Sequence, residues 1–380
     1  MRGMKRLFAT VAMSAAFLSM GEPPAYGADA RTGWQAEWEK TVAAAKKEGR
    51  VNVYMWGSTA VLDEGVFQKR FPEVKLFVVQ GLGSQLEQRI LAERRAGSYL
   101  ADVVIHGANP TYNALYRAKV LDPIKPQFIL PEVVDESKWW GGKHRYVDPE
   151  GKYVFVALGT ASSGGFSYNT NLVKNPQEFK SFWDFVNPKW KGKIIVQDIR
   201  GNPGRARAPL TFIYHHPELG PKFLRRFFAE MDATLFKDER LGTDWLAIGK
   251  YPLCFACNSR VAKQQGLSVD QFGLLKEGQG LSPQAGTLVL VNRAPHPNAA
   301  RVFINWFLSR EGQTAYQAAG QKPGESSTNS LREDVPKDVL ALDSRRQEGV
   351  YYLPLDRWDV LDIEPIYAAI NEGLKQAGKQ

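Results

Sequence analysis

The stretch from Val78 to Gly97, VVQGLGSQLEQRILAERRAG, carries residue types that could hold an anion. An apolar run ends at Gly81-Leu82-Gly83, and Ser84 then begins a segment with helical periodicity. A strand, a glycine turn and a helix N-terminus form a common anion-binding geometry, because the first N–H groups of a helix have no partners within it. The stretch is therefore compatible with a nucleotide loop, another kind of ligand site or a plain tight turn.

The glycine pattern does not fit the two common nucleotide-binding loops. A dinucleotide fingerprint needs a third glycine where this chain has Leu86, and it follows the first strand rather than the second. A Walker loop needs Gly-Lys-Ser/Thr, which does not occur in the sequence. Two interpretations stay open. Ser84-Gln85-Leu86-Glu87 matches a capping box, and Gly83 and Ser84 can also contact a small ligand through a backbone N–H and a hydroxyl.

The histidines and serines do not form a hydrolase motif. None of the five histidines belongs to an HExxH pattern; they are His106, His144, His215, His216 and His296. Ser162-Ser163-Gly164-Gly165 is not a GxSxG nucleophile elbow, because the residue two before Ser163 is Ala161. We therefore expect no enzyme, no metal site and no cofactor. An exported hydrolase remains an alternative, which assays with esterase and phosphatase substrates would test.

The two cysteines, Cys254 and Cys257, lie in the run YPLCFACNSR. If this run is a buried strand, positions i and i+3 face opposite ways and sit roughly 10 Å apart, which is beyond disulfide reach. A zinc site would need a second pair of ligands, which the sequence lacks. The pattern predicts two buried, unreactive thiols.

The N-terminus has the order of a secretory signal peptide. Basic residues precede the apolar run Leu7 to Met20, and small residues follow at Ala25 to Ala28. This order predicts a signal peptide over residues 1–27, with cleavage after Gly27 or, as a second candidate, after Ala30. Because the sequence has no cysteine near these positions, we expect an exported periplasmic protein without a lipid anchor. No later run is long and apolar enough to suggest a membrane span.

Charge and length limit the kinds of partner. The formal net charge is +9, and the predicted signal peptide contributes +2 of it, which leaves about +7. This mild excess suits an anionic ligand. Lysine and arginine are spread along the chain without a recognition motif, so we expect no nucleic-acid binding. The remaining roughly 350 residues suggest two domains or lobes.

Strands and helices alternate along the first half of the chain, which is typical of an α/β fold with a mostly parallel sheet. We expect helices at 38–47, 60–70 and 84–95, and strands at 51–55, 74–80 and 101–106. Sheets of this kind bind ligands beyond the carboxyl ends of their strands. Those ends carry Trp56-Gly57-Ser58-Thr59, Gly81-Leu82-Gly83-Ser84 and His106-Gly107-Ala108-Asn109. We expect a crevice lined by these groups, in which Trp56 either stacks on an aromatic or sugar ring or belongs to the core.

A second alternating region predicts a second lobe. Its expected strands lie at 153–158, 166–168, 193–198, 234–237, 251–256, 272–276 and 286–291, before an amphipathic helix at 298–317. Small residues at 158–165, which include Ser162 and Ser163, and at 281–287 suit a hinge. We expect a first lobe at 28–157 to which 285–320 returns, a second lobe at 158–284, and a tail at 321–380 that packs mainly on the second lobe.

Four ordered segments resemble the periplasmic solute-binding proteins of ABC importers, in the extracellular solute-binding family that includes the ferric-ion-binding proteins. They are WEKTVAAAKKEGRVNVYMWGS, GSQLEQRILAERRAGSYLADVVIHG, GGFSYNTNLVKNPQEFKSFWDFVNPKWKGKIIVQD and GTLVLVNRAPHPNAARVFINWFLSREGQTAYQ. The resemblance covers nearly all of the mature chain. It implies a two-lobed α/β fold with a hinge (class II-like), a ligand that closes the lobes, and delivery to an inner-membrane ABC permease. We expect a monomer.

The resemblance also bears on iron. Ferric members hold the metal with two adjacent tyrosines after the strand that corresponds to 251–256, and with a histidine after the first strand. At the position of the tyrosines this chain has Asn258-Ser259, and at the position of the histidine it has Trp56-Gly57-Ser58. A tyrosine pair does occur, Tyr351-Tyr352, but it lies in the C-terminal tail and not where the ferric members have theirs. Because ferric ion demands anionic oxygen ligands, we expect an organic anion instead, with ferric binding as the alternative.

The family's anion position carries over to Arg200, Gly201 and Asn202, where an arginine fork suits a carboxylate, phosphonate or phosphate. Arg205 and Arg207 follow closely, and a solvated loop is an equal interpretation for both. Arg240 and Asp244 are weaker candidates. The remaining candidate contact, Asn258, stands where the ferric members have a tyrosine. These positions predict that Arg200→Ala weakens binding more than Arg207→Ala.

Overall fold

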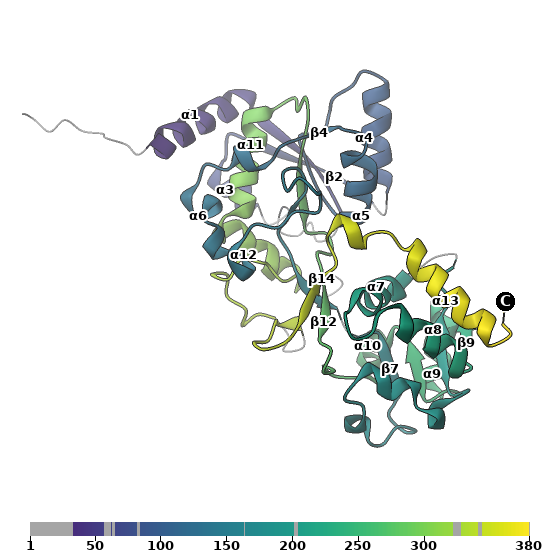
Figure 1. The fold of residues 1–380 in the computed structure, drawn as a ribbon. Helices are drawn as coiled ribbons and strands as arrows, with labels where there is room; N and C mark the ends of the chain where they lie inside the picture. Colours follow the sequence, from purple (N-terminus) through teal and green to yellow (C-terminus); the bar gives the residue numbers. More distant parts are fainter. Residues whose placement is uncertain are drawn as a thin grey trace, which may run out of the picture.

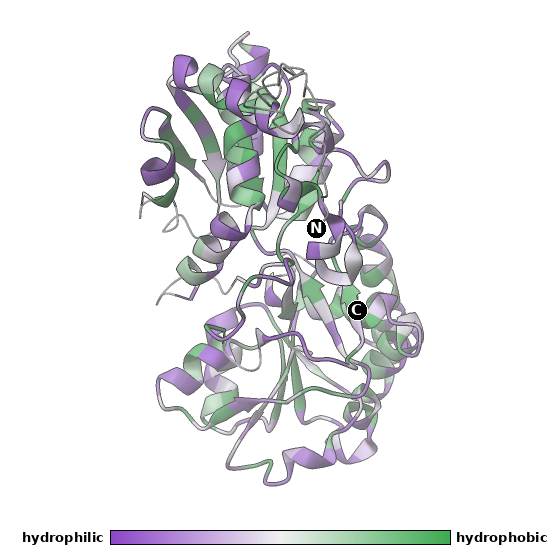
Figure 2. Cartoon of the chain, turned by 90° about the vertical axis from the view of Figure 1, so that its left-hand side faces the viewer, coloured by the Kyte–Doolittle hydropathy of each residue, from purple (hydrophilic) through white to green (hydrophobic). Residues whose placement is uncertain are grey.

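The chain folds into two lobes joined by a small central sheet (Figure 1). The computed structural model describes residues 33–379 apart from 57–61, 63–64, 82–83, 163, 201–203, 322–327 and 341–343. The predicted signal peptide lies outside the described residues. Among the helices that are described, none is long and apolar enough to cross a membrane. Each lobe has its own hydrophobic core, and Figure 2 shows the apolar residues concentrated on strands inside the lobes.

The first lobe is built on a mixed sheet with the strand order β2-β1-β3-β13-β4, and β5 also pairs with β13. β1 runs parallel to β2 and β3, whereas β13 is antiparallel to β3. The strands are β1 (Arg50–Met55), β2 (Lys75–Gln80), β3 (Val103–His106), β4 (Leu121–Asp122), β5 (Phe155–Val156) and β13 (Thr287–Val291). The α-helices are α1 (Gly33–Glu48), α3 (Val66–Arg70), α4 (Gln85–Arg95), α5 (Ala108–Pro110), α6 (Pro131–Val134), α11 (Pro297–Leu308) and α12 (Arg310–Ala319). A π-helix, η1 (Thr111–Tyr116), and the 3-10 helices η2 (Lys125–Gln127), η3 (Glu136–Lys138) and η4 (Trp140–Gly142) complete the lobe.

The second lobe is built on the sheet β11-β7-β10-β8-β9, in which β8, β9 and β10 are parallel. The strands are β7 (Phe166–Asn169), β8 (Ile194–Gln197), β9 (Thr234–Phe236), β10 (Leu253–Phe255) and β11 (Val269–Gln271). The helices are α7 (Arg207–His215), α8 (Gly220–Glu230), α9 (Glu239–Ala247), α10 (Ser259–Gln264) and α13 (Glu364–Gln376), with 3-10 helices η5 (Pro176–Glu178), η6 (Phe182–Val186), η7 (Pro188–Trp190) and η8 (Gly204–Ala206). A further 3-10 helix of the C-terminal tail, η10 (Trp358–Val360), contacts the first lobe, where the N–H of Trp358 donates to the carbonyl oxygen of Val147. Stacked phenylalanine rings fill the core, such as Phe166 on Phe185 at 3.7 Å between centroids.

Strands at the crossings between the lobes lie side by side. β6 (Thr160–Ser162) pairs antiparallel with β12 (Gln279–Ser282), and β14 (Tyr352–Pro354) adds a third strand next to β12. The glycines that flank this sheet are explained by close packing. A Cβ atom on Gly286 would lie 2.4 Å from Leu158, and one on Gly159 would lie 2.6 Å from Leu331. The narrow crossing therefore requires residues without side chains.

The C-terminal tail contacts both lobes. The buried guanidinium of Arg332 donates to the carbonyl oxygens of Glu132 and Leu308 in the first lobe. Arg346 donates to the carbonyl oxygen of Gly159 at the central sheet. α13 then packs along α8 on the second lobe, as Figure 1 shows. The tail thus spans the joint between the lobes.

Two expected elements differ from the structure. The strand expected at 272–276 is wrong, because β11 lies at Val269–Gln271, where its backbone pairs with β7. The helix expected at 298–317 is interrupted at Ser309, whose extended backbone separates α11 from α12. Ser309 caps α12, since its Oγ accepts from the N–H of Gly312 at 3.1 Å. The apolar periodicity continues across this break, so it did not reveal the cap.

Candidate functional site: the cleft between the lobes

A cleft of about 1020 Å³ lies between the lobes. Its wall combines residues of four parts of the chain: the first lobe, the central sheet, the second lobe and the C-terminal tail. The first lobe contributes Trp56 and residues 107–110, and the tail contributes Ser344, Gln347, Leu355, Val360 and Leu361. Such a volume matches the upper end of small-molecule sites.

The first-lobe wall is neutral. Trp56 directly follows β1, and its backbone N–H donates to the carbonyl oxygen of Ile105 at 3.0 Å. The centroid of its indole ring lies 5.4 Å from the centroid of the His106 ring. Residues 107–110 continue the wall directly after β3. A Cβ atom on Gly107 would lie 3.7 Å from the Trp56 ring and 3.4 Å from the carbonyl oxygen of Gln284. The missing side chain therefore leaves room beside the tryptophan.

A buried Glu87–His106 pair lies behind Trp56. The Glu87 carboxylate is 3.2 Å from Nδ1 of His106, and the two side chains are 0% and 2% exposed. Burial raises the pKa of Glu87 from 4.5 to about 7, because desolvation disfavours the charged form. The capping box, one of the two interpretations that the sequence left open, is not formed: the side chain of Ser84 makes no cap hydrogen bond, and Glu87 is buried in the core. This glutamate supports the wall that carries Trp56.

Glu87→Gln should remove a pH dependence of stability. Because the folded-state pKa of Glu87 is raised, its contribution is fully present below pH 4.5 and is lost as the pH rises towards 7. Relative to the variant, the wild-type free energy of unfolding should fall by about 2–3 kcal/mol between pH 4.5 and pH 8. Urea unfolding at several pH values measures it. The surface control Glu73→Gln, whose carboxyl has a lowered pKa, should give a small change of opposite sign. Parallel pH curves for wild type and Glu87→Gln would contradict this assignment.

The second-lobe wall carries the charged residues of the cleft lining: Arg205, Arg207, Arg260 and Asp270. Arg205 is paired with Glu239, and Asp270 with Lys263 at 2.7 Å. Arg207, at the first position of α7, is partly buried and donates to the carbonyl oxygen of Leu361 at 2.7 Å. Burial lowers the pKa of Arg207, but arginine stays charged in proteins. Within the described part of the chain, Arg207 and Arg260 form no ion pair, so this wall carries a positive surplus.

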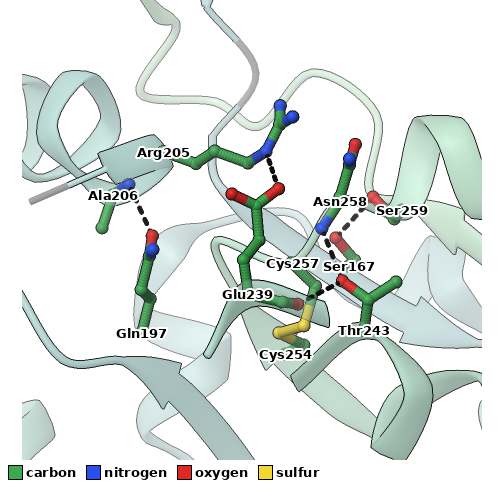
Figure 3. Close-up of a disulfide and its surroundings, with 10 residues drawn as sticks. All are labelled: Ser167, Gln197, Arg205, Ala206, Glu239, Thr243, Cys254, Cys257, Asn258 and Ser259. Carbon is green, nitrogen blue, oxygen red and sulfur yellow. Dashed lines mark hydrogen bonds and ion pairs between the residues drawn. A yellow bond between two sulfur atoms is a disulfide. The ribbon is translucent and has the colours of Figure 1, made fainter. Parts of the chain in front are cut away.

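Cys254 and Cys257 form a disulfide at the edge of this wall, so the prediction of two free thiols is wrong (Figure 3). β10 ends at Phe255, and Ala256 adopts a left-handed backbone with φ 70°. This turn brings the two Cα atoms to 5.9 Å, within disulfide range. The strand geometry assumed from the sequence does not extend to residue 257.

The turn after β10 is held from two further sides. The N–H of Asn258 donates to Oγ1 of Thr243 at 3.0 Å, and Oγ of Ser167 donates to Oγ of the buried Ser259 at 2.8 Å. Figure 3 shows these two contacts around the disulfide. Cys257, Asn258 and Arg260 all line the cleft. The sequence CNSR thus becomes a fixed part of the second-lobe wall.

The structure brings only some of the predicted site residues together. Trp56 and Asn258 line the cleft, and His106 lies behind Trp56. The exposed Ser84 begins α4 outside the lining, where its Oγ accepts from Gln88. β6 contributes its backbone to the central sheet, and its residues Thr160 and Ala161 line the cleft. Gly57, Ser58, Thr59, Gly83, Ser163, Gly201, Asn202 and the side chain of Ser162 lie outside the described residues.

Two predicted arginines do not line the cleft. The Arg200 guanidinium donates to both carboxylate oxygens of Asp198, at 2.9 and 3.0 Å. This bond lowers the pKa of Asp198. The Arg240 side chain is 92% exposed and lies 3.9 Å from Asp244. Arg205 and Arg207, which were secondary candidates, lie in the cleft instead.

Some lining residues had no clear sequence signal. Arg260 is two positions after Asn258, so the family position of the tyrosine pair could have pointed to it. The glutamines and tail residues had no motif of their own: Gln271, Gln279, Gln284, Ser344 and Gln347. In the described ranges, no group of three or more His, Cys, Asp or Glu side chains could hold a metal ion.

Several solved structures share this fold. Apo FutA2 from Synechocystis is 15% identical, with a TM-score of 0.59 over 86% of this chain and 98% of that chain. FutA (IdiA) of Trichodesmium, in complex with iron and citrate, is 19% identical, with a TM-score of 0.60 over 87% and 100%. Iron-bound HitA from Pseudomonas aeruginosa is 16% identical, with a TM-score of 0.51 over 86% and 99%. At these identities the likeness supports the two-lobed fold alone.

No curated protein is significantly similar to this chain in sequence. The family model described as bacterial extracellular solute-binding protein matches residues 55–314, which contain most of both sheets and the residues on both sides of the cleft. This match covers more than half of the chain and agrees with the two-lobed architecture. The chain is therefore a member of the bacterial extracellular solute-binding protein family.

Proposed function

We propose that this protein captures a small organic anion between its lobes and delivers it to the permease of an ABC importer. The observation that carries the proposal is the charge of the cleft. Arg207 and Arg260 line it without an ion-pair partner among the described residues, whereas Arg205 and Asp270 are each paired. An anionic ligand would neutralise this surplus. Carboxylates, phosphonates and phosphates are the leading classes.

Arginine suits this role because its guanidinium presents five N–H donors in a fixed fork. The Arg207–Leu361 hydrogen bond uses one of these donors. Charge-assisted hydrogen bonds of this kind stabilise by about 1.5–3 kcal/mol each. The remaining donors can therefore hold an anionic oxygen while Leu361 keeps the side chain in place.

Export belongs to the same proposal. The family is extracellular, and the basic, apolar and small residues at positions 1–27 would direct the chain to the periplasm. In this role the lobes would close on the ligand and the closed form would contact the permease.

Iron is the competing ligand, because two of the similar structures contain it. The chemistry of this cleft favours an anion. Asn258 and Ser259 follow β10, so neither supplies a phenolate oxygen there, and ferric ion prefers anionic oxygen ligands. A positively charged wall would also repel a bare cation. The complex of the Trichodesmium protein contains citrate as well as iron, so a test must include ferric citrate alongside citrate alone.

A thermal-shift screen tests the proposal. At about a hundred times its dissociation constant, a ligand that binds only the folded state stabilises by roughly 2.7 kcal/mol. We expect one or more carboxylates, phosphonates or phosphates to raise the melting temperature, without added metal. Ferric chloride and ferric citrate are the matched comparisons. A shift with ferric salts alone, in the absence of a shift with any organic anion, would overturn the proposal.

A further inference from the structure

The two walls of the cleft differ in chemistry. The charged residues of the lining, Arg205, Arg207, Arg260 and Asp270, belong to the second lobe. The first-lobe wall consists of Trp56 and residues 107–110, none of which has an ionisable side chain. A ligand held by both lobes therefore meets cations on one side and an aromatic ring on the other.

The side chain of Trp56 is held in place at the wall of the cleft, where a ligand can pack against it. Its backbone is fixed to β3 by the bond to Ile105, and the buried His106 supports its ring. The absence of a side chain on Gly107 keeps the space beside the ring open. Trp56 is only partly buried although it packs against the hydrophobic core of the first lobe. An aromatic pair is stabilised both by the apolar area that it buries and by the geometry between the rings. A ligand ring that packs against Trp56 would therefore bind more tightly than a ligand without a ring.

The cleft has room for a ligand larger than a lone small anion. Its volume of about 1020 Å³ is that of a site for a ligand with many atoms. Neutral hydrogen-bonding groups from the second lobe and the central sheet, Gln271, Gln279 and Gln284, line the space along with the two walls. They can bond to substituents of a larger ligand without adding charge.

We propose that the ligand carries a ring, either an aromatic ring or a sugar ring with an apolar C–H face, that packs against Trp56, and an anionic group that is held by Arg207 and Arg260. This inference rests on the proposed function, because the arginines supply the attraction for the anionic end. Trp56 then determines specificity: it selects ring-bearing anions over open-chain anions with the same charged group.

Matched ligand pairs test the proposal by isothermal titration calorimetry. Each pair shares its anionic group and differs in the ring: benzoate against acetate, phenylphosphonate against methylphosphonate, and glucose 6-phosphate against glycerol 3-phosphate. In at least one pair, the ring-bearing member should bind about tenfold more tightly to the wild type, the size typical of an aromatic contact with its buried area. The pair that shows the preference distinguishes an aromatic ring from a sugar ring.

Trp56 variants assign the preference to this side chain. Trp56→Ala should lower the affinity for the ring-bearing member about tenfold more than the affinity for the open-chain member, whereas Trp56→Phe should keep most of the difference. Equal affinities within every pair that binds would overturn the inference and leave the proposed function intact. The same holds if Trp56→Ala weakens both members of a pair equally. If no member of any pair binds, this inference fails, and the thermal-shift screen decides the proposed function separately. The wild-type comparison does not depend on the folding of a variant.

Discussion

Arg207→Ala should weaken binding of an organic anion about 10- to 100-fold. Arg207 lines the cleft at the start of α7, and no ion pair to a described residue neutralises its guanidinium. The variant loses at least one charge-assisted hydrogen bond of about 1.5–3 kcal/mol, which corresponds to this change in affinity. Calorimetric titration with the anion that gives the largest thermal shift measures it.

Two variants serve as controls. Arg207→Lys keeps the charge but loses the planar fork, so it should recover only part of the affinity. Arg200→Ala removes a guanidinium that lies outside the cleft lining and is bound to Asp198, so it should change the affinity less than twofold. Since Arg207 also bonds to Leu361, the melting temperature without ligand must be compared for all variants. If Arg200→Ala weakens binding and Arg207→Ala does not, the anion lies where the family position implied.

The choice between Arg200 and Arg207 shows what the sequence could not decide. Both arginines follow β8 in one arginine-rich segment, and the family position pointed to the first of them. Which guanidinium turns into the cleft depends on local partners. Asp198 stands two residues before Arg200 and holds it, whereas Leu361, which holds Arg207, comes from the tail 154 residues later. A contact over that separation has no signature in a single sequence.

Local patterns predicted the elements that depend on local interactions. The alternation of strands and helices located β1, β2 and β3, and so placed Trp56 and His106–Asn109 together at one edge of a parallel sheet. The same reasoning was wrong where the backbone changes direction without a glycine. Ala256 takes a left-handed conformation that favours glycine, and Ser309 begins a new helix inside a continuous apolar pattern. The role of the tail as a cleft wall also depends on long-range packing, as the lining by Leu361 shows.

Removal of the Cys254–Cys257 disulfide should lower both stability and affinity. Closing so short a loop stabilises by about 2 kcal/mol in the chain-entropy model, so the double variant Cys254→Ser, Cys257→Ser should lose about that much unfolding free energy. The bond also holds Ala256 in a left-handed conformation that costs roughly 1–2 kcal/mol for a residue with a Cβ atom. Without the bond, the competent turn should be populated less, and ligand affinity should fall about 5- to 30-fold.

A glycine substitution at the turn distinguishes the effect of the disulfide on ligand affinity from its effect on the stability of the lobe. Ala256→Gly in the cysteine-free background removes the penalty of the left-handed backbone, so it should restore much of the affinity while the lost disulfide contribution to stability remains absent. Urea unfolding gives the stabilities, titration with the anion used for Arg207→Ala gives the affinities, and wild type treated with dithiothreitol is the matched reduced control. If the reduced wild type binds as tightly as the oxidised protein, the bonds from Asn258 to Thr243 and from Ser167 to Ser259 are sufficient to hold the turn. The disulfide would then act on stability alone, because the contacts of Asn258 and Arg260 with the cleft would not depend on it.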